Sequence, residues 1–135
     1  MRILLALLFG SVVVGLTMAA PVPKQLKRSP ESKLLGTWRL TASDSLGNGK
    51  RGYDFFVEFK AEGELEFYYL YPNGRKIAYY GTYKFIDGDK VDYTINRGGT
   101  QKTEILTMNT FTADEIQWTD PDGLKETLEK TEVKK

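Results

Sequence analysis

The side chains that could do chemistry in this chain are carboxylates, lysines and hydroxyls, because its 135 residues include neither cysteine nor histidine. This absence excludes a structural zinc site, a cysteine nucleophile, an imidazole base and a disulfide framework. Glu58 and Glu66 form the clearest carboxylate pair, but the sequence pattern places them on the outer face of a hairpin, away from the cleft that paired-carboxylate catalysis requires. Lys60 or Arg39 is expected to lie between them, because like charges directly opposite one another are unfavourable. We expect a protein that is not an enzyme.

Two short patterns suggest ligand sites. Residues 47–52 read Gly-x-Gly-x-x-Gly around Lys50 and Arg51, but a phosphate loop needs a following helix, and a strand pattern begins at Tyr53 instead. Two pairs of close aspartates could supply oxygen ligands to calcium, although each pair is also ordinary turn chemistry with too few ligands. These pairs are Asp87 with Asp89 and Asp120 with Asp122. We therefore expect no metal and no cofactor.

Residues 1–19 have the pattern of a secretory signal peptide. Arg2 precedes an apolar run over residues 3–14, and small residues precede a cleavage point after Ala19. The alternative is an uncleaved anchor helix, although the run is shorter than the ~20 residues that a membrane span needs. We expect a secreted or periplasmic protein that meets a membrane only during export. The near balance of 19 basic and 18 acidic residues predicts no nucleic-acid partner.

The remaining chain is expected to divide into a linker over residues 20–31 and one domain over residues 32–135. Ser29 and Pro30 predict a short helical turn that brings Leu34 and Leu35 to the bottom of the domain. Beyond it, apolar and polar residues alternate between glycine-containing turns, which is typical of antiparallel β-structure. The expected strands are 36–43, 53–60, 64–71, 75–86, 90–96, 102–109, 115–119 and 124–131, the last being a strand or a short helix.

Turn lengths fix which residues of these strands face each other. Three-residue loops at 61–63, 72–74 and 87–89 all give the same apolar face, with Gly63 left-handed in the first loop. The expected pairs are Phe59 with Leu65, Val57 with Phe67, Phe55 with Tyr69, Tyr69 with Ile77, Phe67 with Tyr79, Phe85 with Val91 and Tyr83 with Tyr93. Such a meander closes most simply as an up-and-down barrel of about eight strands, and a flattened sandwich is the alternative.

Two sets of aromatic residues are candidates for binding. The inner set of tyrosines needs partners for its hydroxyl groups if it is buried, which suggests a wet cavity or a mouth, and the alternative is a narrow barrel that these rings fill completely. Its members are Tyr53, Tyr69, Tyr71, Tyr79, Tyr83 and Tyr93. The outer set, Phe56, Tyr68 and Tyr80, is predicted to form an apolar patch that could contact a protein partner or a second copy of the chain.

The segment Leu35-Gly36-Thr37-Trp38 resembles the Gly-x-Trp signature that opens the lipocalin barrel, and the layout of the chain is similar to small secreted lipocalin-like proteins of bacteria. The resemblance implies that Trp38 closes one end of an all-β barrel. It also implies an arginine near the last strand packed on this tryptophan, where this chain offers only Lys125 and Lys130. The loop containing Lys50 and Arg51 would overhang the open mouth.

Together these features predict an exported, non-catalytic binding protein. A small apolar or amphipathic molecule would bind inside the barrel, near the inner tyrosines, Lys50 and Arg51. The alternative is a barrel completely filled by its own side chains, which acts as a protein–protein interaction module through Phe56, Tyr68 and Tyr80.

Overall fold

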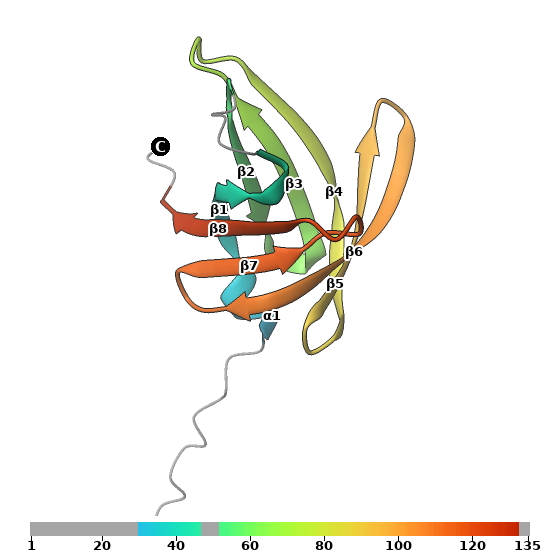
Figure 1. The fold of residues 1–135 in the computed structure, drawn as a ribbon. Coiled ribbons are helices and arrows are strands. Elements are labelled where there is room, and N and C mark those ends of the chain that lie inside the picture. Colours follow the sequence, from blue (N-terminus) through green and yellow to red (C-terminus); the bar gives the residue numbers. More distant parts are fainter. Residues whose placement is uncertain (1–29, 47–51, 133–135) are drawn as a thin grey trace, which may run out of the picture.

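The protein is described here from a computed structural model that covers residues 30–46 and 52–132. Within these ranges it forms a closed antiparallel barrel in which each strand pairs with the next and β8 returns to β1 (Figure 1). The elements are α1 (Pro30–Leu34), β1 (Gly36–Ser43), η1 (Asp44–Leu46), β2 (Asp54–Phe59), η2 (Ala61–Gly63), β3 (Glu64–Leu70), β4 (Lys76–Asp87), β5 (Lys90–Arg97), β6 (Thr100–Phe111), β7 (Glu115–Thr119) and β8 (Lys125–Thr131). The predicted eight-stranded barrel is confirmed, and its last segment is a strand.

The short helix α1 begins at Pro30, the expected first helical position. Pro30 has no N–H group to leave unsatisfied there, and Glu31 lies in the first turn, where a negative charge is favourable. The helix buries Leu34 completely, whereas Leu35 stays partly exposed. Helix α1 thus begins two residues before the expected domain boundary at residue 32.

The registers follow the turn lengths. In the first hairpin Phe59, Val57 and Phe55 lie opposite Leu65, Phe67 and Tyr69, and Gly63 has a φ of 76°. A β-carbon on Gly63 would lie 2.9 Å from the Tyr83 carbonyl oxygen, so both the backbone angle and the space favour glycine there. The second hairpin likewise pairs Tyr69 with Ile77 and Phe67 with Tyr79. These predicted pairs are confirmed.

The third hairpin keeps its predicted pairs but has a different turn. Phe85 lies opposite Val91, as expected, yet Asp87 pairs with Lys90, so the loop is shorter than the predicted three residues. The register shifts between Phe85 and Asp87, which makes Ile86 the extra residue of a β-bulge. The bulge absorbs the residue that the prediction had placed in the loop.

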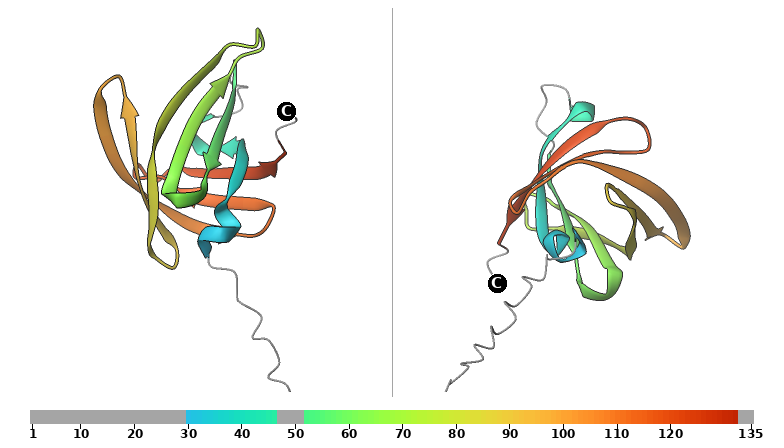
Figure 2. Two further views of the ribbon diagram at one scale, coloured as in Figure 1. Left: turned by 180° about the vertical axis from the view of Figure 1, so that it is seen from behind. Right: turned by 90° about the horizontal axis from the view of Figure 1, so that it is seen from below.

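The two ends of the barrel differ, and we name them the helix end and the mouth. The helix end carries α1 and the turns β2–β3, β4–β5 and β6–β7, whereas the mouth carries the turns β3–β4, β5–β6 and β7–β8 (Figure 2). The buried core between them consists of Leu34, Trp38, Val57, Phe59, Leu65, Phe67, Tyr83, Val91, Ile95, Leu106, Met108, Ile116, Trp118 and Leu128.

Trp38 closes the helix end, as the lipocalin resemblance implies. Its side chain is fully buried, and its Nε1–H donates a hydrogen bond to the Leu34 carbonyl oxygen at 2.7 Å. Phe111 packs against the indole with ring centroids 6.5 Å apart. The Nζ atom of Lys130 lies 5.1 Å from the ring centroid, so a lysine of β8 occupies the place expected for an arginine.

Candidate functional site

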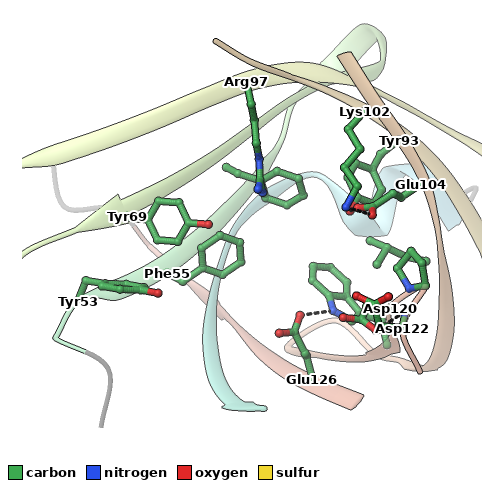
Figure 3. Close-up of a pocket in the computed structure, with 14 residues that line it drawn as sticks. Tyr53, Phe55, Tyr69, Tyr93, Arg97, Lys102, Glu104, Asp120, Asp122 and Glu126 are labelled. Carbon is green, nitrogen blue, oxygen red and sulfur yellow. Dashed lines mark hydrogen bonds and ion pairs between the residues drawn. The ribbon is translucent and has the colours of Figure 1, made fainter. Parts of the chain in front are cut away.

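A cavity of about 350 Å³ opens at the mouth, near the lower end of the range for small-molecule pockets. Figure 3 shows its lining side chains around a common central space. One side, which we call the aromatic wall, consists of Tyr53, Phe55, Phe67 and Tyr69 from β2, β3 and the residue before β2. The other side, the polar wall, consists of Tyr93, Arg97, Lys102, Glu104, Asp120, Asp122 and Glu126, with Leu106, Trp118 and Pro121 between them.

Strand alternation and ring packing build the aromatic wall. Phe55 and Tyr69 are register partners on the inner face, and their ring centroids lie 5.1 Å apart. Tyr53 meets Tyr69 edge-on at 5.0 Å, and Phe55 stacks on Phe67 at 5.7 Å. Each ring is held by its neighbours, so the wall presents a preformed apolar surface to the cavity.

Tyr93, Glu104 and Lys102 form a connected group on the polar wall. The Tyr93 hydroxyl donates to the Glu104 carboxylate, which also forms an ion pair with Lys102. Burial, reinforced by the hydrogen bond to Glu104, raises the pKa of Tyr93, so its hydroxyl stays protonated. Burial alone would raise the pKa of Glu104, but the hydrogen bonds from Lys102 and Tyr93 outweigh it and lower that pKa. Glu104 is therefore ionised at neutral pH, and the charge of Lys102 balances its negative charge.

Glu126 is held differently. Its Oε2 accepts a hydrogen bond from Trp118 Nε1–H at 2.8 Å, and its Oε1 accepts one from the Ser43 hydroxyl at 3.1 Å. Trp118 is 2% exposed and lies opposite Glu126 across β7 and β8. Within residues 30–46 and 52–132, no ion pair involves Glu126. Its charge meets neutral donors rather than a cation.

The remaining charged groups lie around the rim of the cavity. Asp120 Oδ1 accepts the backbone N–H groups of Asp122 at 2.9 Å and Leu124 at 2.8 Å, the expected aspartate turn. Arg97 lies over the Tyr79 ring at 5.3 Å. No cluster of three or more acidic side chains that could hold a metal ion occurs in the described part of the chain.

The predicted inner tyrosines separate into groups. Tyr53, Tyr69 and Tyr93 line the cavity. Tyr71 packs on Tyr53 at 5.5 Å but is not part of the lining, and Tyr83 donates its hydroxyl to the Lys60 carbonyl oxygen at 3.0 Å, beside η2 at the helix end. Lys50 and Arg51, which the sequence predicts to lie in a loop over the mouth and near the ligand, fall outside the described residues.

Sequence reasoning predicted Tyr93 but missed the charged residues of the polar wall. Lys102, Glu104 and Glu126 were not predicted as site residues, although a simple signal points to them. Glu104 lies opposite Tyr93 and Glu126 lies opposite Trp118, so both occupy inward positions of the period-two pattern. Extending the alternation from Leu106 back to Glu104 and Lys102, and from Leu128 back to Glu126, would have placed all three in the barrel.

The outer aromatic set is largely covered by its own chain. Phe56 stacks on Tyr68 at 4.8 Å, and Lys76 Nζ lies 4.2 Å from the centroid of the Tyr68 ring. Tyr68 is consequently only 7% exposed, whereas Tyr80 is 60% exposed. Of the three predicted residues, Tyr80 is therefore far more exposed on the outer face than Tyr68.

Glu58 and Glu66 face each other on this outer surface, as expected. Lys60 contacts both, at 2.9 Å from Glu66 and 4.0 Å from Glu58, and Lys76 adds a contact of 2.6 Å to Glu66. Arg39, the other expected partner, pairs with Asp54 instead. Burial would raise the pKa of Glu66, but the hydrogen bonds from Lys76 and Lys60 outweigh it and lower that pKa.

No protein-family model matches the chain, and no curated protein matches it. Among solved structures, a lipocalin-like protein from Bacteroides uniformis is similar with a TM-score of 0.56 at 14% identity, over 73% of this chain and 99% of that one. An uncharacterized protein from Bacteroides eggerthii gives a TM-score of 0.56 at 19% identity over the same shares. A redesigned β-barrel gives 0.51 at 22% identity, over 77% of this chain and 96% of that one. These likenesses show a lipocalin-like fold.

Proposed function

We propose that this lipocalin-like barrel is an exported, non-catalytic protein that binds a small amphipathic molecule in its mouth. The observation that carries the proposal is the cavity of about 350 Å³ between the aromatic wall and the polar wall. The rings of the aromatic wall suit the apolar body of a ligand. The charged groups opposite would lose hydration against a purely apolar molecule, so a ligand with polar groups is favoured.

The protonation states of the cavity support binding rather than catalysis. General acid–base groups work best with a pKa near the operating pH. In this cavity the pKa of Glu104 is lowered and that of Tyr93 is raised, so both move away from neutrality. Each group keeps one protonation state around pH 7 and serves as a fixed hydrogen-bonding partner.

Export remains part of the proposal and rests on the signal-peptide pattern of residues 1–19. Within the described residues, no helix has the length and apolar character to cross a membrane. A cleaved leader would release the barrel on the far side of the cytoplasmic membrane, where it could collect its ligand. Determining the N-terminal residue of the protein in the culture medium or periplasm tests this step, with Ala20 as the expected first residue.

Native mass spectrometry of the protein purified gently from its own cells tests binding directly. We expect an additional mass of a few hundred daltons, in keeping with the small volume of the cavity. Tyr69→Ala removes part of the aromatic wall and should reduce the bound fraction. Tyr80→Ala removes an exposed tyrosine from the outside of the neighbouring strand and should leave it unchanged. A bare mass for the unaltered protein, or equal bound fractions in the two variants, would contradict the proposal.

A further inference from the structure

We propose that the ligand carries a cationic group, such as an ammonium, and that Glu126 binds it while the apolar body lies on the aromatic wall. This inference rests on the proposed function, because it assigns a ligand class to the same cavity. Three observations support it: the bonding of Glu126, the charges of the lining, and the position of the rings.

The first observation is that no cation of the described residues forms an ion pair with Glu126 at the cavity. A carboxylate offers about four lone-pair sites, and the two side chains that donate to Glu126 within residues 30–46 and 52–132, Trp118 and Ser43, are both neutral. Glu104, by contrast, already has a cationic partner in Lys102. Of these two carboxylates, Glu126 is therefore the one that gains most from a cation supplied by the ligand.

The second observation is the excess of acidic groups in the described lining, which holds four carboxylates and two cations. Lys102 is engaged by Glu104, and Arg97 lies over the Tyr79 ring on the far side of the space from Glu126 (Figure 3). Asp120 and Asp122 line the same cavity as Glu126 and add charge of the same sign. A cleft in which charges of one sign are in excess concentrates ligands of the opposite sign.

The third observation is the aromatic wall. Tyr53, Phe55 and Tyr69 lie across the cavity from Glu126 and point into the same space (Figure 3). Such rings bind an apolar body through contact area, and their faces also attract cations. An anion would meet neither Glu126 nor these rings favourably. The wall therefore adds to the preference for an amphipathic cation.

Three probes that share a phenyl ring and a four-carbon chain test the inference: phenylbutylamine, phenylbutanol and phenylbutyrate. Trp118 lines the cavity, and Trp38 is buried at the helix end, so intrinsic fluorescence reports occupation of the cavity. We expect the amine to bind about tenfold or more tightly than the alcohol. One charge-assisted hydrogen bond to a carboxylate contributes an affinity difference of this size. The carboxylate should bind most weakly. Trp118→Phe should abolish most of the fluorescence response.

Glu126→Gln removes the charge and keeps an oxygen acceptor for Trp118. It should weaken amine binding about tenfold and leave alcohol binding nearly unchanged. The matched control is Glu129→Gln, an exposed residue of the same strand outside the cavity lining, which should change neither. Equal binding of amine and alcohol to the unaltered protein, or tightest binding of phenylbutyrate, would overturn the cation preference while the proposed function stands. If none of the three probes binds, both the cation preference and the proposed function fail for this ligand class.

Discussion

The two tryptophans of the barrel are both buried and both donate their indole N–H, yet they lie in opposite environments. Trp38 at the helix end donates to the Leu34 carbonyl oxygen, packs against Phe111 and lies beneath Lys130. Trp118 donates to the carboxylate of Glu126 and borders the cavity. A main-chain acceptor completes a sealed end, whereas a charged acceptor keeps part of its bonding capacity for another molecule. The comparison distinguishes a sealed end from the end that holds the cavity, where we propose that the ligand binds.

The largest expected effect is the loss of Trp38. Trp38→Ala leaves a dry hole at the helix end and should lower the free energy of unfolding by about 3–5 kcal/mol. Trp118→Ala should cost about 2–3 kcal/mol, because the space it vacates joins a cavity that water can enter. Urea unfolding followed by far-UV circular dichroism measures both values without relying on tryptophan fluorescence. Equal losses for the two variants would remove the distinction between the ends.

The two lysine-bound carboxylates, Glu66 outside the barrel and Glu104 in the mouth, extend the comparison to pH. Because the pKa of Glu66 is lowered in the folded state, its charge stabilises the fold above about pH 4.5, and this contribution disappears as the pH falls through the lowered pKa. Glu66→Gln should therefore lower the free energy of unfolding by about 1–3 kcal/mol at neutral pH and by much less in acid.

Urea titrations at neutral pH and below pH 4 check this expectation. Glu58→Gln is the control, because the Glu58 carboxylate lies 4.0 Å from Lys60 and is half-exposed, so its loss should cost at most about 0.5 kcal/mol. A difference between the Glu66→Gln variant and the unaltered protein that persisted undiminished in acid would show that the ion pairs are not its source.

Tyr83 and Tyr93 allow a finer comparison, because they lie directly opposite each other on β4 and β5. Their hydroxyls point to different ends of the barrel. The Tyr83 hydroxyl donates a hydrogen bond to the Lys60 carbonyl oxygen, and the Tyr93 hydroxyl donates one to the Glu104 carboxylate. Tyr83→Phe should lower the free energy of unfolding by about 1 kcal/mol and leave phenylbutanol binding unchanged. Tyr93→Phe should change the affinity for phenylbutanol, because it removes a hydroxyl from the polar wall. Weaker binding in the Tyr83 variant alone would reverse this assignment.

The sequence predicts the sheet better than it predicts the site. Turn lengths and the alternation of Phe55, Val57 and Phe59 determine the register, since a slip by one residue would invert every side chain. Alternation gives the face of a side chain but not what covers it. Tyr68 faces outward as predicted, yet Phe56 and Lys76 cover its ring, and this depends on three strands meeting at once.

The charged residues of the polar wall were missed for a different reason. Glu104 and Glu126 occupy inward positions, but a charged residue there looks like the end of an apolar pattern unless a partner is known. Their partners, Tyr93 and Trp118, come from neighbouring strands, and only the closed barrel brings them together. The sequence does not predict the bulge at Ile86 either. The number of residues between Phe85 and Val91 fits a three-residue loop and a shorter loop with a bulge equally well.

The smallest expected effect tests whether Lys130 replaces the arginine that the lipocalin resemblance implies. Lys130→Met keeps most of the aliphatic stem but removes the charge over the Trp38 ring, so the free energy of unfolding should fall by about 0.5–1 kcal/mol. Lys130→Arg should retain or exceed the original stability, because a guanidinium also stacks on an aromatic face. Lys125→Met, in the same strand but without a described contact to Trp38, is the control and should change little. If the Lys130 and Lys125 variants unfold at the same urea concentration, the cation contributes nothing, and Phe111 and Leu34 alone close the helix end.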